Sequence, residues 1–81
     1  MVSQMATPTT IGARLKLLRG PKTIEEVSKA TGLGRTALSN YEAGFRVPRD
    51  EAKLILANYY ERTVDEIFFT ADDTIRVNAA D

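Results

Sequence analysis

The stretch 23–44 constrains the fold more than any other part of this chain, because it carries its own helix starts and stops. Thr23 is a good N-cap, and Glu26 follows at the capping-box spacing, which satisfies two backbone N–H groups at a helix start. Gly32 suits the left-handed conformation that ends a helix, and Gly44 repeats this signal. The pattern predicts two short helices joined by a tight turn, a helix-turn-helix unit.

Apolar residues recur at helical spacing in both halves of this stretch. The first set is Ile24, Val27 and Ala30, and the second is Ala37, Leu38 and Tyr41. Helices of about eight residues do not persist alone in water. We therefore expect other parts of the chain to cover these apolar faces.

Three more helices are predicted around this unit. A first helix starts at Thr9 or Thr10 and ends at about Arg19, before a Gly-Pro pair. A fourth helix covers residues 49–60, and a second capping box opens a short fifth helix over 63–69. The apolar positions expected to face the core are Ile11, Leu15, Leu17, Leu18, Ala52, Ile55, Leu56, Tyr59, Val64, Ile67 and Phe68.

The two ends of the chain differ from its helical part. Residues 1–8 are small and polar, and we expect them to form a flexible arm. In the tail over 70–81, residues 74–78 alternate polar and apolar side chains, the period of a β-strand. So short a strand is not stable alone, so this segment either pairs with a second copy of the chain, as a dimerisation element, or is a frayed end. The expected organisation is an all-α, five-helix domain over 9–69 with a short tail.

The composition argues against several classes of function. The chain contains no cysteine and no histidine, so it lacks thiolate metal ligands, the commonest general base and the commonest metal ligand. We therefore expect no enzyme, no metal and no cofactor. No apolar run reaches the length of a membrane span, and the N-terminus lacks the features of a secretory signal. A cytoplasmic protein with no membrane partner is expected.

Charge is unevenly distributed although the net charge is zero. Residues 14–53 contain nine basic and five acidic residues, a net charge of +4, whereas residues 54–81 contain two basic and six acidic residues, a net charge of −4. Such a chain can present a positive face to phosphates while it stays neutral overall. Chance clustering on solvated helix faces explains the same distribution, so charge alone leaves both interpretations open.

The order and spacing of these pieces resemble the Cro/cI-type, or XRE-like, helix-turn-helix family, which has the lambda-repressor-like fold. The matching pieces lie within 11–68 and are ARLKLLR, TIEEVSKATGLGRTALSNYEAG, Pro48, LILANYY and TVDEIF. One departure concerns recognition. The family usually has Gln directly after the cap of the second helix, where it contacts the DNA backbone and braces the next helix. Ile24 stands there in this chain, which puts that phosphate contact in question.

The resemblance implies that the helix over 34–43 lies in the major groove of DNA. The residues that would then contact base edges are Arg35, Thr36, Ala37, Ser39 and Asn40. Arg35 is the strongest candidate, because a guanidinium can form two parallel hydrogen bonds to guanine. Asn40 can do the same with adenine. Outside this motif, both would be ordinary exposed helix residues.

The resemblance also implies phosphate contacts and one ion pair. The candidate phosphate contacts are Thr23, Arg46, Arg49 and Lys22. Thr23 stands at a helix start with free N–H groups, although capping alone explains it. The family commonly pairs a carboxylate of the reading helix with an arginine of the first helix, and Glu42 and Arg19 occupy these positions. We interpret this pair as structural.

The function implied by the resemblance is sequence-specific regulation of transcription on double-stranded DNA. Its simplest form is a repressor, of phage or mobile-element type, that binds a palindromic operator as a homodimer. An antitoxin would share this domain and bind a toxin, and an antirepressor is another protein partner of this kind. A third hypothesis is a domain used only for protein binding, which the missing Gln would permit.

Overall fold

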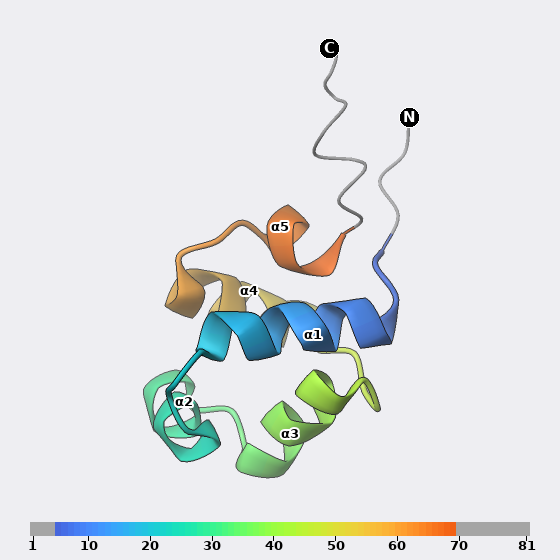
Figure 1. Cartoon of the computed structure of the whole chain (residues 1–81). Coiled ribbons are helices and arrows are strands. Elements are labelled where there is room, and N and C mark those ends of the chain that lie inside the picture. The colour runs from blue at the N-terminus through green and yellow to red at the C-terminus, as the bar shows by residue number, and fades with distance from the viewer. Residues whose placement is uncertain (1–4, 70–81) are drawn as a thin grey trace.

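Five α-helices surround one apolar core in the computed structural model, which describes residues 5–69 (Figure 1). They are α1 (Pro8–Arg19), α2 (Ile24–Thr31), α3 (Arg35–Ala43), α4 (Asp50–Tyr60) and α5 (Val64–Phe68). In the view of Figure 1, α5 lies above α1, α4 runs behind α1, and α2 and α3 lie below it. The prediction of an all-α, five-helix domain is confirmed. The tail over 70–81, with the strand expected at 74–78, lies outside the described residues.

The first helix begins earlier than the sequence predicted. Its N-cap is Thr7 and not Thr9 or Thr10, and the Thr7 hydroxyl accepts a hydrogen bond from the backbone N–H of Thr10 at 3.2 Å. Pro8 therefore falls in the first helical turn, where a missing N–H costs nothing. The helix gains one residue that the prediction assigned to the arm.

The segment before this cap is also part of the folded domain. The Ala6 side chain is buried, and the Ala6 N–H donates to the Phe68 carbonyl at 2.9 Å. Met5 and Phe69 form an isolated antiparallel β-bridge. The flexible arm predicted over 1–8 is therefore wrong for residues 5–8, because this segment packs against the end of α5.

Both predicted capping boxes are formed. The Thr23 hydroxyl accepts from the Glu26 N–H at 3.0 Å, and the Glu26 carboxylate accepts from the Thr23 N–H at 2.8 Å. The same two bonds join Thr63 and Glu66, at 3.1 Å and 2.8 Å. The glycines that end α2 and α3 are left-handed, with φ of 81° and 83°. Local sequence signals therefore set three of the boundaries that frame the helix-turn-helix unit.

The core draws on every helix. Its buried apolar residues are Ala6, Ile11, Leu15, Val27, Leu38, Tyr41, Leu56, Ala57, Ile67 and Phe68. Of the predicted apolar positions, Ala52 is buried outside this cluster, Ile55 is only partly buried, and two others are exposed. Leu17 is 81% exposed and Ala30 is also exposed, because each lies on the outer face of its helix. Ala57 is buried although its position was not predicted to be.

Two residues of α1 fix its neighbours in ways that the sequence did not reveal. A Cβ atom on Gly12 would lie 2.4 Å from the Glu42 carbonyl oxygen, so only glycine lets α1 and α3 approach this closely. Arg14 donates through Nη1 to the carbonyls of Glu66 at 3.3 Å and Ile67 at 3.0 Å, which holds the end of α5 against α1. Among the described helices, none has the length and apolar composition needed to cross a membrane.

Candidate nucleic-acid interface

Side chains of α2 hold the turn that leads into α3. The Ser28 hydroxyl donates to the Leu33 carbonyl at 2.6 Å. The Thr31 hydroxyl donates to the Val27 carbonyl at 2.7 Å and accepts from the Leu33 N–H at 3.2 Å. Leu33 itself packs against the core. These four contacts fix the direction in which α3 leaves the turn, and sequence reasoning had assigned none of these hydroxyl roles.

Helix α3 has one buried face and one exposed face. Leu38 and Tyr41 are 3% and 6% exposed and attach the helix to the core. Of the residues predicted to contact bases, those exposed are Arg35, Thr36 and Ser39, and those partly buried are Ala37 and Asn40. The N-cap is Gly34, so no side chain caps the first N–H groups of α3. The exposed polar residues therefore share the solvent side of a helix whose other side is anchored.

The two partly buried residues have additional structural roles. Ala37 packs against the core, which limits how much of its methyl group is available to a ligand. The Asn40 carbonyl accepts from the N–H groups of Phe45 at 2.9 Å and Arg46 at 3.3 Å. The backbone of Asn40 thus organises the loop after α3, while its side chain stays partly accessible.

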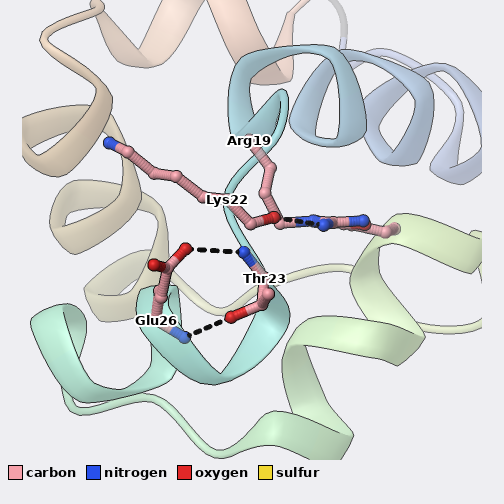
Figure 2. A network of polar contacts seen from close by, with 5 residues as sticks. Arg19, Lys22, Thr23 and Glu26 are labelled. Carbon is pink, nitrogen blue, oxygen red and sulfur yellow. Dashed lines mark hydrogen bonds and ion pairs between the residues drawn. The ribbon is translucent and has the colours of Figure 1, made fainter.

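The ion pair expected between Arg19 and Glu42 is formed in a two-bond geometry. Arg19 Nε lies 2.8 Å from one carboxylate oxygen of Glu42, and Nη2 lies 3.0 Å from the other. The side chains are 19% and 12% exposed. The hydrogen bond to Glu42 raises the pKa of Arg19 above its ordinary value. Arg19 Nη1 also donates to the Lys22 carbonyl (Figure 2), so one guanidinium ties α1 to α3 and to the start of α2.

Tyr60 lies in the same neighbourhood, at the end of α4. Burial, with a smaller contribution from the negative charge of Glu42, raises the pKa of Tyr60 to about 12. The Tyr60 ring meets that of Tyr59 edge-on, with centroids 4.9 Å apart. Both rings pack against the core. The two tyrosines therefore support the fold and are poorly placed to stack on bases.

The candidate phosphate contacts fall into two groups. Arg46 and Arg49 are exposed in the loop between α3 and α4, and the loop begins at the carboxyl end of α3. The Lys22 ammonium instead lies 4.9 Å from the centre of the Tyr59 ring, and in Figure 2 this side chain points away from α3. The Thr23 hydroxyl serves the capping box shown in the same view. The backbone of Arg46 is bonded to the last turn of α3, Arg49 is the N-cap of α4, and Lys22 is directed away from α3.

Ile24 occupies the position where the resemblance would place Gln. It is the first residue of α2, it is partly buried, and it lines a shallow recess together with Ser39 and Ala43 of α3. An apolar side chain therefore stands at this position, in a recess that charged side chains also line. Within residues 5–69, no group of three or more acidic side chains is placed to hold a metal ion.

Comparison with known protein families identifies the segment that contains α2 and α3. A family model described as a helix-turn-helix domain matches residues 10–67. No curated protein matches the sequence. The matched segment runs from the third residue of α1 to the fourth residue of α5, so it contains the whole of α2, α3 and α4.

Proposed function

The chain belongs to the helix-turn-helix domain family, and we propose that it regulates transcription by reading double-stranded DNA with α3. One observation carries the proposal. The polar residues at the start of α3, led by Arg35, are exposed, while the opposite face of the same helix is anchored in the core. A helix held in this way can enter the major groove without losing its packing. Arg35 then contributes bidentate recognition of guanine, with Thr36, Ser39 and Asn40 beside it.

The exposed arginines of the loop after α3 support the same placement of α3 in the major groove. Arg46 and Arg49 lie beyond the carboxyl end of α3, where a helix in the groove brings the phosphate backbone close. Phosphate contacts of this kind set the register of the protein on the duplex but do not select a sequence. Ile24 offers no polar group at the start of α2, so α2 contributes less to this grip.

The finer part of the proposal is a repressor of the Cro/cI type that binds a palindromic operator as a homodimer. A single domain of this size makes few contacts, and a second copy on a symmetric site doubles them. The two half-sites would then be separated by about 34 Å, one turn of the duplex. Binding at such a site would exclude polymerase from an overlapping promoter.

Selection of bound sites from random duplex DNA tests this function. We expect an enriched motif with inverted symmetry. The logarithm of the binding constant should fall linearly with the logarithm of salt concentration, with a slope of about −0.9 for each neutralised phosphate. If no duplex binds below micromolar concentration at low salt, the proposal is wrong.

A second candidate function is protein binding without DNA. The observation in its favour is Ile24, because an apolar residue replaces a polar contact to the DNA backbone at the start of α2. The same selection separates the two functions, since a domain used only for protein binding enriches no motif.

A further inference from the structure

Phe45 is the most exposed aromatic residue in the described part of the chain. Its side chain is 79% exposed, although the transfer of an aromatic ring out of water is favourable. Isolated exposed apolar residues are common on protein surfaces, so exposure alone carries no function. A functional role for Phe45 therefore has to rest on its position and on the residues around it.

The loop that carries Phe45 is held at both ends. The Phe45 N–H donates to the Asn40 carbonyl at 2.9 Å. Gly44 has φ of 83°, and a Cβ atom there would lie 3.3 Å from the Cα of Thr9, so the loop passes close to the start of α1. Pro48 is buried at the other end of the loop. The backbone at Phe45 is therefore fixed while its ring projects into solvent.

The loop that carries Phe45 is basic in sequence. Residues 43–49 contain two arginines, Arg46 and Arg49, and no acidic residue; Asp50 and Glu51 follow in the first turn of α4, where Asp50 pairs with Lys53 at 3.6 Å. Both arginines are exposed. The nearest preceding acid, Glu42, is paired with Arg19. A fixed aromatic ring among cations matches the chemistry of nucleic acid, which offers apolar sugar and base faces beside phosphates.

Other exposed apolar residues have different neighbours. Leu17 is 81% exposed and lines a recess on the far side of α1 with Arg62 and Glu66. Leu54 is 61% exposed and lines a recess with Asp50 and Lys53. Each of these sites contains an acid as well as a base. The loop of Phe45 instead follows α3 directly, and its charged residues before α4 are both arginines.

We propose that Phe45 is a DNA-contact residue whose ring packs on the deoxyribose and base surface beside the half-site, next to phosphates bound by Arg46 and Arg49. This inference rests on the proposed function. The contact adds affinity that does not depend on sequence, because every nucleotide offers a sugar and a base face. It offers a partial substitute for the backbone contact that Ile24 cannot make.

A fluorescent reporter tests this contact directly, because the chain contains no tryptophan. Phe45→Trp places a single indole in the loop, and Leu17→Trp places one at an equally exposed position away from α3. On titration with the selected duplex, we expect the emission of the Phe45→Trp protein to fall as the indole packs on a nucleotide. The emission of the Leu17→Trp protein should stay constant over the same titration.

Affinity measurements provide a second test of the Phe45 contact. Phe45→Ala should weaken binding about tenfold on both the selected and a shuffled duplex, with an unchanged salt slope, because no phosphate contact is lost. Arg46→Ala should reduce the magnitude of the slope by about 0.9. Leu17→Ala should bind like the wild type.

These measurements distinguish a failure of the Phe45 contact from a failure of the proposed DNA-binding function. If the wild type binds a duplex and Phe45→Ala binds equally well, Phe45 lies outside the interface while the proposed function stands. If the loss appears on a duplex with two half-sites and not on one with a single half-site, Phe45 contacts a second copy of the chain and the inference is wrong. If the wild type binds no duplex at all, the proposed function itself fails.

Discussion

The ion pair between Arg19 and Glu42 fixes the position of α3 relative to α1. The pair joins the last turn of α1 to the last turn of α3 through two short hydrogen bonds. Because both side chains are mostly buried, the removal of one partner leaves a charge with little access to water. The pair should therefore affect stability before it affects DNA recognition.

Glu42→Ala should lower the free energy of unfolding by about 3 kcal/mol, the lower end of the range for a half-removed buried pair. The matched control is Glu25→Ala. Glu25 forms an exposed pair with Lys29 at 3.5 Å, and its loss should cost about 0.5 kcal/mol or less. Urea denaturation followed by helical circular dichroism measures both. Equal effects in the two variants would contradict a structural role for Glu42.

Gly12→Ala tests the close approach of α1 and α3. The added methyl group would collide with the carbonyl oxygens of Glu42 and Tyr41, at 2.4 Å and 2.7 Å, and backbone atoms cannot move aside without shifting a helix. We expect a loss of about 3 kcal/mol in unfolding free energy, at the upper end for overpacking. Gly34→Ala is the control, since a Cβ atom there meets no atom within 4 Å; it should cost about 1 kcal/mol at most, because alanine is a poorer N-cap.

At the scale of secondary-structure elements, α5 depends on its contact with α1. It has five residues and cannot persist alone. Its start is closed by the Thr63 capping box, and its last carbonyls accept hydrogen bonds from the Arg14 guanidinium. Ile67 and Phe68 are then fully buried where α5 packs against α1 and the segment that precedes it. The cationic group also interacts favourably with the negative end of the helix dipole.

Arg14→Met should therefore loosen α5 selectively. We expect about 2 kcal/mol less protection against hydrogen exchange for the Ile67 and Phe68 amides, because charged hydrogen bonds to their segment are lost. Lys16→Met, at an exposed position of the same helix, is the control. Amide exchange followed by NMR distinguishes the two. A uniform loss of protection across all helices would show that Arg14 supports the whole fold and not α5 in particular.

The elements most accurately predicted from sequence are those with local signals. Thr23 and Thr63 were identified as caps because each bonds to groups only three residues away. The start of α1 was misplaced because Thr7, Thr9 and Thr10 can all cap a helix, and the choice among them depends on where the preceding segment packs. Local chemistry alone cannot decide between neighbouring caps.

Contacts between distant segments were not predictable in the same way. Gly12 and Arg14 act on residues that follow them by about 30 and 50 positions, so no local pattern marks them. Leu17 was assigned to the core because its spacing permits burial, and only the position of neighbouring helices leaves it exposed. The base contacts of Arg35 and Asn40 stay predictions, since exposure does not identify a base.

Across the whole molecule, basic residues are concentrated in the first part of the sequence and acidic residues in the last part. The segment 14–53 carries a net charge of +4 and includes α2, α3 and the loop arginines, whereas 54–81 carries −4. Like charges of two copies on one operator would repel, and pairing of the basic part of one copy with the acidic part of another would reduce that repulsion.

Deletion of residues 70–81 should weaken dimerisation while the helical domain stays folded. The alternating pattern at 74–78 is the sequence basis for this prediction, because an isolated strand of this length needs a partner. Sedimentation equilibrium, with and without operator duplex, measures the association. An unchanged mass for the truncated protein in both conditions would show that this tail takes no part in assembly.

We propose that α3 reads base sequence through Arg35. The ratio of the affinities for a selected and a shuffled duplex tests this role directly. Equilibrium binding is measured for the wild type and for Arg35→Ala on the selected duplex and on a shuffled duplex at one salt concentration. We predict that Arg35→Ala lowers this ratio about tenfold or more, the value of one bidentate contact, while helical circular dichroism is unchanged. A ratio that is the same in both proteins would contradict this account.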